Sequence, residues 1–217
     1  MAEIAASNSK RRYQGMDGHE REANRRERLL QTGLDLFGTV GYHDTTVVDI
    51  CRQAGVARRF FYESFADREA LLLAVYDVQI QRLQGAVLNA VAAAGPRIED
   101  MVEASIDAYV HQVLADERAG RLIFVEIFRG GPTAEARRHE VRHQFYELII
   151  TLLTESLSTP RSTRIEMGVT ILVGGVADLA GEWLLGHSGG TIDDICRTST
   201  DMFNTIYHQF LQELAAD

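Results

Sequence analysis

Two adjacent arginines followed by three aromatic residues are the most suggestive chemical group in this chain. The segment reads Arg58-Arg59-Phe60-Phe61-Tyr62-Glu63-Ser64. A guanidinium group can bind guanine O6 and N7 with two hydrogen bonds or hold a phosphate. We therefore expect Arg58 and Arg59 to contact a nucleic-acid duplex. Phe60 can contact a thymine methyl group, and the Tyr62 hydroxyl can donate to a phosphate oxygen.

A second group has the spacing of a zinc enzyme. His139-Glu140-Val141-Arg142-His143 matches the HExxH pattern, in which two histidines on one helix face bind zinc and the glutamate acts as a general base. Three nearby arginines disfavour a bound cation, and Glu155, Glu166 and His187 lack a recognisable third-ligand spacing. We expect no catalytic residue, metal or cofactor. A zinc hydrolase and a helical adaptor that does not bind DNA remain the alternatives, and stoichiometric zinc in the purified protein would distinguish the first.

The elements around the arginine pair predict a helix-turn-helix. An apolar stripe predicts a helix over about 21–40, which Gly41 ends. A short helix then follows Thr46, whose hydroxyl can cap it and whose backbone N–H groups can meet a phosphate. Gly55-Val56 forms the turn, and a third helix over 57–64 would enter the major groove, with Phe61 and Phe65 packed inward.

The segment GYHDTTVVDICRQAGVARRFFYESFADREALL resembles the N-terminal domain of TetR-family transcriptional regulators. The similarity covers about residues 21–75. It departs from the usual pattern in four places: Gly33 replaces a common alanine, Ala57 replaces a capping serine, Ser64 replaces a phosphate-contacting histidine, and Arg68 replaces a lysine. The matching residues are Gly41-Tyr42, Thr45-Thr46-Val47, Asp49-Ile50, Ala54-Gly55-Val56, Phe61-Tyr62, Phe65 and Arg68-Glu69-Leu71-Leu72. The resemblance implies that Thr46, Ser64 and Arg68 also lie at the DNA.

The charge is distributed unevenly along the 217 residues. The formal net charge is −9, yet residues 1–68 carry 11 basic and 10 acidic residues. A basic face can therefore bind phosphates although the whole chain is acidic. We expect a flexible basic arm over 1–20, a DNA-binding domain over 21–66 and an effector-binding and dimerisation domain over 67–217.

Composition predicts an all-α protein of about nine helices. The chain has only 3 prolines and shows no sustained two-residue alternation, and Gly95-Pro96 separates the later helices. These are expected at about 97–115, 118–129, 133–157, 161–187 and 192–214. The 2 cysteines, Cys51 and Cys196, exclude a disulfide scaffold. No apolar run approaches about 18 residues and no signal peptide is apparent, so we expect a cytoplasmic protein without a membrane span.

The resemblance implies that the acidic C-terminal part binds a small effector and forms a homodimer. Six aromatic residues could line a mostly apolar pocket, with His111 or Glu126 as its polar group, although ordinary core packing explains each aromatic equally well. Small residues in the helix expected at 161–187, together with large apolar residues of that helix and the last one, suit a dimer interface, and a twofold dimer would read a pseudo-palindromic operator. We expect a repressor that a small, mostly apolar effector releases. The aromatic residues are Tyr109, Phe124, Phe128, Phe145, Tyr146 and Trp183.

Overall fold

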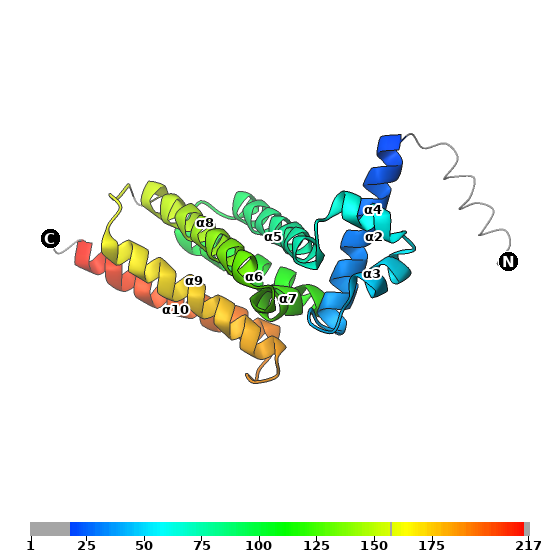
Figure 1. Ribbon diagram of the computed structural model, residues 1–217. Helices are drawn as coiled ribbons and strands as arrows, with labels where there is room; N and C mark the ends of the chain where they lie inside the picture. The colour runs from blue at the N-terminus through cyan, green and yellow to red at the C-terminus, as the bar shows by residue number, and fades with distance from the viewer. Residues whose placement is uncertain (1–17, 157, 215–217) are drawn as a thin grey trace.

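The computed structural model describes residues 18–156 and 158–214, and all regular secondary structure within these ranges is helical. Figure 1 shows α2, α3 and α4 gathered at one end of the molecule, beside a bundle of longer helices. The predicted all-α class is confirmed. The elements are α2 (Gly18–Thr39), α3 (Val47–Ala54), α4 (Arg58–Ser64), α5 (Arg68–Ala93), α6 (Ile98–Leu114), α7 (Glu117–Phe124), the 3-10 helix η1 (Glu126–Arg129), α8 (Pro132–Ser156), α9 (Thr163–Leu184) and α10 (Ile192–Leu214).

The helix boundaries follow the local chemistry of the sequence. Gly41 and Gly55 both adopt a positive φ, of 101° and 61°, where the chain leaves a helix. Asp67 accepts a hydrogen bond from the Ala70 backbone N–H and so caps α5. One expected helix is divided: residues 118–129 form α7 and η1, because Val125 leaves helical geometry with a φ of −126°.

The core of the described residues runs without a break from the N-terminal helices into the bundle. Leu29, Phe37 and Phe61 are fully buried between α2, α3 and α4, and Leu71, Leu72 and Val75 continue the same apolar cluster along α5. A smaller cluster joins the end of α8 to the start of α9. This continuity couples the position of the three short helices to that of α5.

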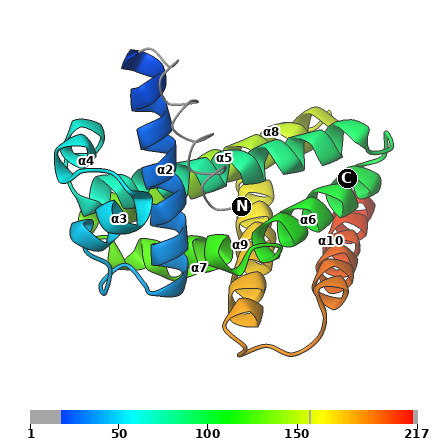
Figure 2. The same cartoon turned by 90° about the vertical axis from the view of Figure 1, so that its right-hand side faces the viewer.

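Helix α7 and η1 hold the end of α2 through close and polar contacts. Arg118 Nη1 lies 2.5 Å from the Asp35 carboxylate. A Cβ on Gly38 would come within 2.5 Å of the Arg118 Cβ, so only glycine permits this approach of α2 to α7. The buried Glu126 carboxylate accepts a hydrogen bond of 2.8 Å from the Tyr42 backbone N–H. Figure 2 shows α7 crossing the lower part of α2.

Candidate DNA-binding surface and effector cavities

Helix α3 begins in a complete capping box. The Thr46 hydroxyl donates to Asp49 Oδ2 (2.5 Å) and accepts from the Asp49 backbone N–H (3.2 Å). Asp49 Oδ2 in turn accepts from the Thr46 backbone N–H (3.2 Å), and these bonds hold the pKa of Asp49 below its ordinary value. Thr46 is exposed, as a phosphate contact requires. Because Asp49 receives the hydroxyl proton, the Thr46 oxygen could donate to a phosphate only by leaving the box.

The turn between α3 and α4 is held by an arginine from α2. Arg28 Nη2 donates to the carbonyl oxygens of Ala54 and Gly55, the latter at 3.2 Å. Gly55 is left-handed here, and a Cβ at this position would lie 2.6 Å from Arg28 Nη2. Arg28 therefore positions the turn that separates the two short helices. The sequence predicted the turn from Gly55 but contains no local pattern that identifies Arg28, since its partners lie 26 and 27 residues away.

Helix α4 exposes both of its arginines, whereas its aromatic residues divide between a buried side and an exposed side. Phe61 is fully buried and Phe65 is 5% exposed, so the predicted inward packing is confirmed. Arg58 and Arg59 are exposed, and half of the Tyr62 surface is exposed. Two buried aromatic rings thus fix the orientation in which the helix shows the other three side chains.

Phe60 is held between two arginines rather than fully exposed. The guanidinium carbons of Arg25 and Arg59 lie 4.2 and 4.4 Å from the Phe60 ring centroid. Such cation–π contacts restrict the long arginine side chains before they bind a partner. Less side-chain conformational entropy is then lost on binding. Arg25, on α2, therefore extends the cationic surface of α4.

The structure gives Arg68 a bracing position. Its Nη1 donates to the Thr45 carbonyl (2.5 Å) and the His43 carbonyl (3.3 Å), and its guanidinium carbon lies 4.2 Å from the Tyr42 ring centroid. Arg68 is partly buried and connects the start of α5 to the loop before α3.

Ser64 is also partly buried, at the end of α4. Residues 1–17, which include most of the expected basic arm, lie outside the described residues.

An apolar cavity of about 140 Å³ lies between α5, α6, α8, α9 and α10. Its walls include Val91, Ile106, Leu148 and Leu172. The polar side chains that face it are few and uncharged: Ser105, Tyr109 and Ser199. Burial raises the pKa of Tyr109, so its hydroxyl stays protonated. A site of this composition suits an apolar ligand with at most one or two hydrogen-bonding groups.

A second cavity of about 290 Å³ adjoins the first and shares Tyr109, Phe145 and Val173 with it. Five of the six predicted effector residues line it: Tyr109, Phe124, Phe128, Phe145 and Tyr146. Two arginines and two carboxylates line it as well: Arg138, Arg142, Asp178 and Glu182. The second cavity therefore offers charged partners that the first does not.

Three other residues considered for the effector site lie elsewhere. The Trp183 indole N–H donates to the Gly190 carbonyl (3.0 Å) beyond the end of α9. The Glu126 carboxylate is fully buried beside Tyr42, and His111 lies next to Asp107 on a half-exposed face of α6. Their sequence context could not reveal this, because each position depends on which helix packs beside it.

The HExxH residues lie on an exposed face of α8. His139 Nδ1 lies 3.2 Å from Arg142 Nη2, and Glu140 Oε2 accepts a hydrogen bond of 2.7 Å from Arg137. His143 is exposed and lies 3.9 Å from Glu147. Each polar group of the motif thus lies next to a charged side chain, as expected of a solvated helix face.

Helices α9 and α10 carry large apolar side chains on their surface. By length and composition alone, α9 could cross a membrane, and few residues of that stretch are buried. This finding qualifies the expectation that the chain has no membrane span. That expectation considered only uninterrupted apolar runs, whereas α9 is apolar on average over its length. Four of these exposed side chains follow helical spacing: Met167 and Ile171 on α9, and Met202 and Ile206 on α10. A face of this kind is typical of a partner-binding surface.

Comparisons with known proteins agree with the geometry of α2–α4. Residues 29–75 match the family described as "Bacterial regulatory proteins, tetR family". The HTH-type transcriptional regulator BetI of Klebsiella pneumoniae (strain 342) is 34% identical over 88 residues, which are 38% of this chain and 45% of BetI. BetI of Escherichia coli O17:K52:H18 is 33% identical over 88 residues, with the same coverage of both chains. The matched region thus spans less than half the length of these curated relatives.

Solved structures resemble almost the whole fold. The fatty acid degradation regulator FadR from Bacillus halodurans has a TM-score of 0.72 and 15% identity, and the match covers 82% of this chain and 93% of that one. FadR from Bacillus subtilis, solved in complex with stearoyl-CoA, has a TM-score of 0.71 and 13% identity, covering 81% and 96%. At such identities the likeness concerns the fold alone. The similarity to the tetR family of bacterial regulatory proteins is therefore carried by residues 29–75.

Proposed function

We propose that this protein is a homodimeric, ligand-responsive regulator of transcription that binds a pseudo-palindromic DNA operator through α4. The observation that carries the proposal is the orientation of α4: buried Phe61 and Phe65 direct Arg58 and Arg59 into solvent. A short helix with this cationic surface fits the major groove of B-DNA. The tetR-family match of residues 29–75 supports the same assignment. Such a regulator works beside the chromosome, in the cytoplasm.

The contacts divide into those that read bases and those that hold phosphates. Arg58, Arg59 and Phe60 are proposed to face base edges, and Thr46, Tyr62 and Ser64 to face the backbone. Arg68 is proposed to act near the backbone by bracing the loop before α3, because its guanidinium already donates to two carbonyl groups there. The basic arm over 1–20 adds further phosphate contacts.

The effector is proposed to be small and mostly apolar, and the regulator to be a repressor that the effector releases. The cavity between α5, α6, α8, α9 and α10 supports this ligand class, since its walls are almost entirely apolar. The adjoining cavity supplies charged groups for one polar end of the ligand. Bacillus subtilis FadR was solved in complex with stearoyl-CoA, and the acyl part of that compound makes a free long-chain fatty acid a reasonable first probe.

The domain division is proposed at the start of α5, with 21–66 binding DNA and 67–217 binding effector and partner. Helix α5 lines both cavities and packs against α2, so a ligand that moves α5 also moves the DNA-binding helices. The effector shifts the equilibrium between two separations of the α4 helices only as far as its affinities for the two states differ. The exposed apolar side chains of α9 and α10 support a dimer through these helices.

Selection of bound fragments from random duplex DNA tests the proposal. The selected sequence should be a pseudo-palindrome, and Arg58→Ala or Arg59→Ala should weaken its binding by about 1–3 kcal/mol if the side chain reads a base. Arg97→Ala is the matched control, because Arg97 is an exposed arginine that pairs with Asp100 at the start of α6. Equal affinity of both α4 variants and the wild-type protein for the selected sequence would contradict the proposed recognition helix.

A further inference from the structure

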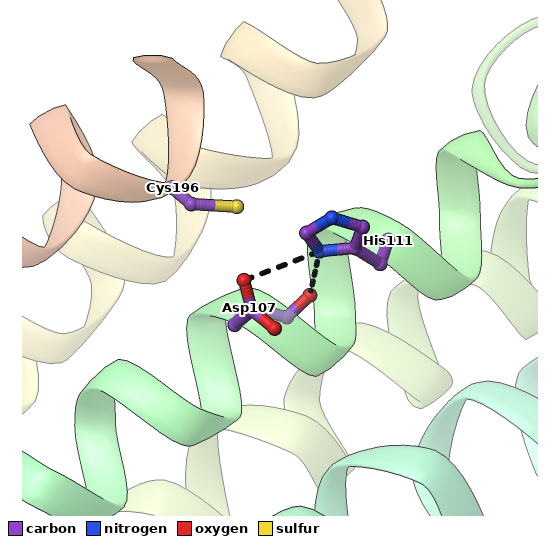
Figure 3. Close-up of side chains that lie close together, drawn as sticks. All are labelled: Asp107, His111 and Cys196. Atoms are coloured by element: carbon purple, nitrogen blue, oxygen red, sulfur yellow. Dashed lines mark hydrogen bonds and ion pairs between the residues drawn. The ribbon is translucent and has the colours of Figure 1, made fainter. Parts of the chain in front are cut away.

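Three side chains with metal-binding atoms meet between α6 and α10. Asp107 and His111 are one turn apart on α6, and Cys196 extends toward them from the first turns of α10 (Figure 3). Their ligand atoms all lie within 4.8 Å of one another. His111 Nδ1 is 3.2 Å from Asp107 Oδ1. These positions combine a carboxylate, an imidazole and a thiol at one point.

The surroundings of this cluster are negatively charged. Asp193 lies one turn before Cys196 on α10 and acts on the thiol together with Asp107. Asp194, the next residue, is occupied elsewhere, because it caps α10 through Thr191 and pairs with Arg197. A divalent cation would compensate the negative potential that the thiol experiences.

We propose that Asp107, His111 and Cys196 form a binding site for a zinc-class divalent cation. Zinc accepts sulfur, nitrogen and oxygen ligands at about 2.0–2.3 Å, so tetrahedral ligand atoms lie roughly 3.5 Å apart. The present separations therefore need only small side-chain rotations to close around the ion. A water molecule or the Asp193 carboxylate completes the four ligands. When the cation binds, the thiol loses its proton to solvent. The ligating nitrogen of His111 must also be unprotonated, so if Nδ1 is the ligand it gives up its 2.9 Å hydrogen bond to the Asp107 carbonyl oxygen and the imidazole proton moves to Nε2.

Such an ion would join α6, which lines the proposed effector cavities, to α10, which belongs to the proposed dimer surface. The cavity-lining residues of α6, such as Ser105, Ile106 and Tyr109, lie on a different face of the helix from Asp107 and His111. The cation thus binds α6 to α10 without entering the effector cavities. Because α10 belongs to the proposed dimer surface, the ion stabilises the part of the protein that carries the dimer, and its removal lowers the melting temperature.

Metal titration of the full-length, untagged protein tests the site. We expect one zinc ion per chain in competition with a chromophoric chelator. Co²⁺ should give an ultraviolet thiolate-to-metal charge-transfer band and the visible bands of a tetrahedral ion. Cys196→Ser should abolish the charge-transfer band. It should weaken zinc binding by at least about tenfold, since loss of an outer-shell partner alone costs ~10–100-fold. His111→Gln should weaken zinc binding similarly.

Two variants serve as matched controls. Cys51→Ala removes the other thiol, which is buried in α3, and His143→Gln removes an exposed histidine of the HExxH segment. Both should bind zinc as the wild-type protein does. The proposal is overturned if the wild-type protein shows no thiolate-to-cobalt band, because this result does not depend on the folding of any variant. Equal zinc affinity of Cys196→Ser and wild type, or loss of binding in His143→Gln alone, would overturn it equally.

Discussion

The buried carboxylate of Glu126 provides a sensitive test of how the DNA-binding helices are attached to the bundle. Its Oε2 accepts a 2.8 Å hydrogen bond from the Tyr42 backbone N–H, and its Oε1 lies 3.4 Å from Arg129 Nη1. Glu126 is fully buried, whereas the Arg129 side chain is 45% exposed. The ion pair with Arg129 is therefore screened by solvent and adds little, and the hydrogen bond to Tyr42 dominates.

We expect Glu126→Ala to lower the free energy of unfolding by about 1–3 kcal/mol. An unpaired buried N–H at Tyr42 costs roughly 1–3 kcal/mol. Loss of the single methylene that alanine lacks, Cγ, costs about 0.8 kcal/mol. Relief of the buried charge offsets part of this sum. Glu126→Gln is the matched control, since its amide oxygen can still accept from Tyr42, and we expect at most about half of the alanine effect.

Urea denaturation followed by circular dichroism at one protein concentration gives these values, because a dimer's stability depends on concentration. The same variants should be titrated with the selected operator. We expect Glu126→Ala to weaken operator binding as well, because Tyr42 lies in the loop that leads to α3. A loss of less than about 1 kcal/mol for alanine, or an equal loss for glutamine and alanine, would refute the reasoning from the Tyr42 hydrogen bond.

Three further predictions concern other parts of the chain. Ile171→Lys should give monomers in light-scattering measurements while the circular dichroism spectrum stays unchanged, because Ile171 is 70% exposed in the single chain; a stable dimer of this variant would place the interface elsewhere. Ala57→Ser should stabilise the protein by about 1 kcal/mol in thermal unfolding, since Ala57 begins α4 without a side-chain cap; an unchanged melting temperature would mean that the serine does not cap. Acid should remove the contribution of the Asp49 capping box as the pH falls below the ordinary carboxyl value of 3.8, because the folded-state pKa of Asp49 is lowered. Asp49→Asn should make the acid limb of the stability curve shallower, and an unaltered limb would contradict this assignment.

Local sequence determined the helix-turn-helix in detail. Thr46 and Asp49 are three residues apart and cap α3 through side-chain bonds to backbone groups of the same turn. Gly55 marks the turn because few other residues adopt a positive φ without strain. Phe61 and Phe65, one helical turn apart, share the buried face of α4. These features depend on contacts within a few residues, so local spacing was enough to predict the Thr46 cap, the Gly55 turn and the buried pair Phe61 and Phe65.

The attachment of that unit and the arrangement of the bundle depended on contacts between distant residues. Arg28 reaches Ala54 and Gly55, and Glu126 reaches Tyr42 across 84 positions. Five of the six aromatic residues predicted to share one pocket line the second cavity, and two of these also line the first, whereas Trp183 bonds to Gly190. Periodicity shows that a residue faces the core but does not identify the helix it meets.

The metal-binding side chains illustrate the same division most clearly. The sequence contains two histidines at zinc-binding spacing in α8. In the structure, however, Arg137 donates a hydrogen bond to Glu140 of this motif, and Arg142 lies next to His139. The i, i+4 pair Asp107 and His111 also has a suitable spacing, but Cys196 is far away along the chain. The sequence by itself determined which side chains share a helix face, because that follows from 3.6 residues per turn. Only the packing of α10 against α6 decided which of those faces receives a thiol, because packing depends on the shapes of both helices together.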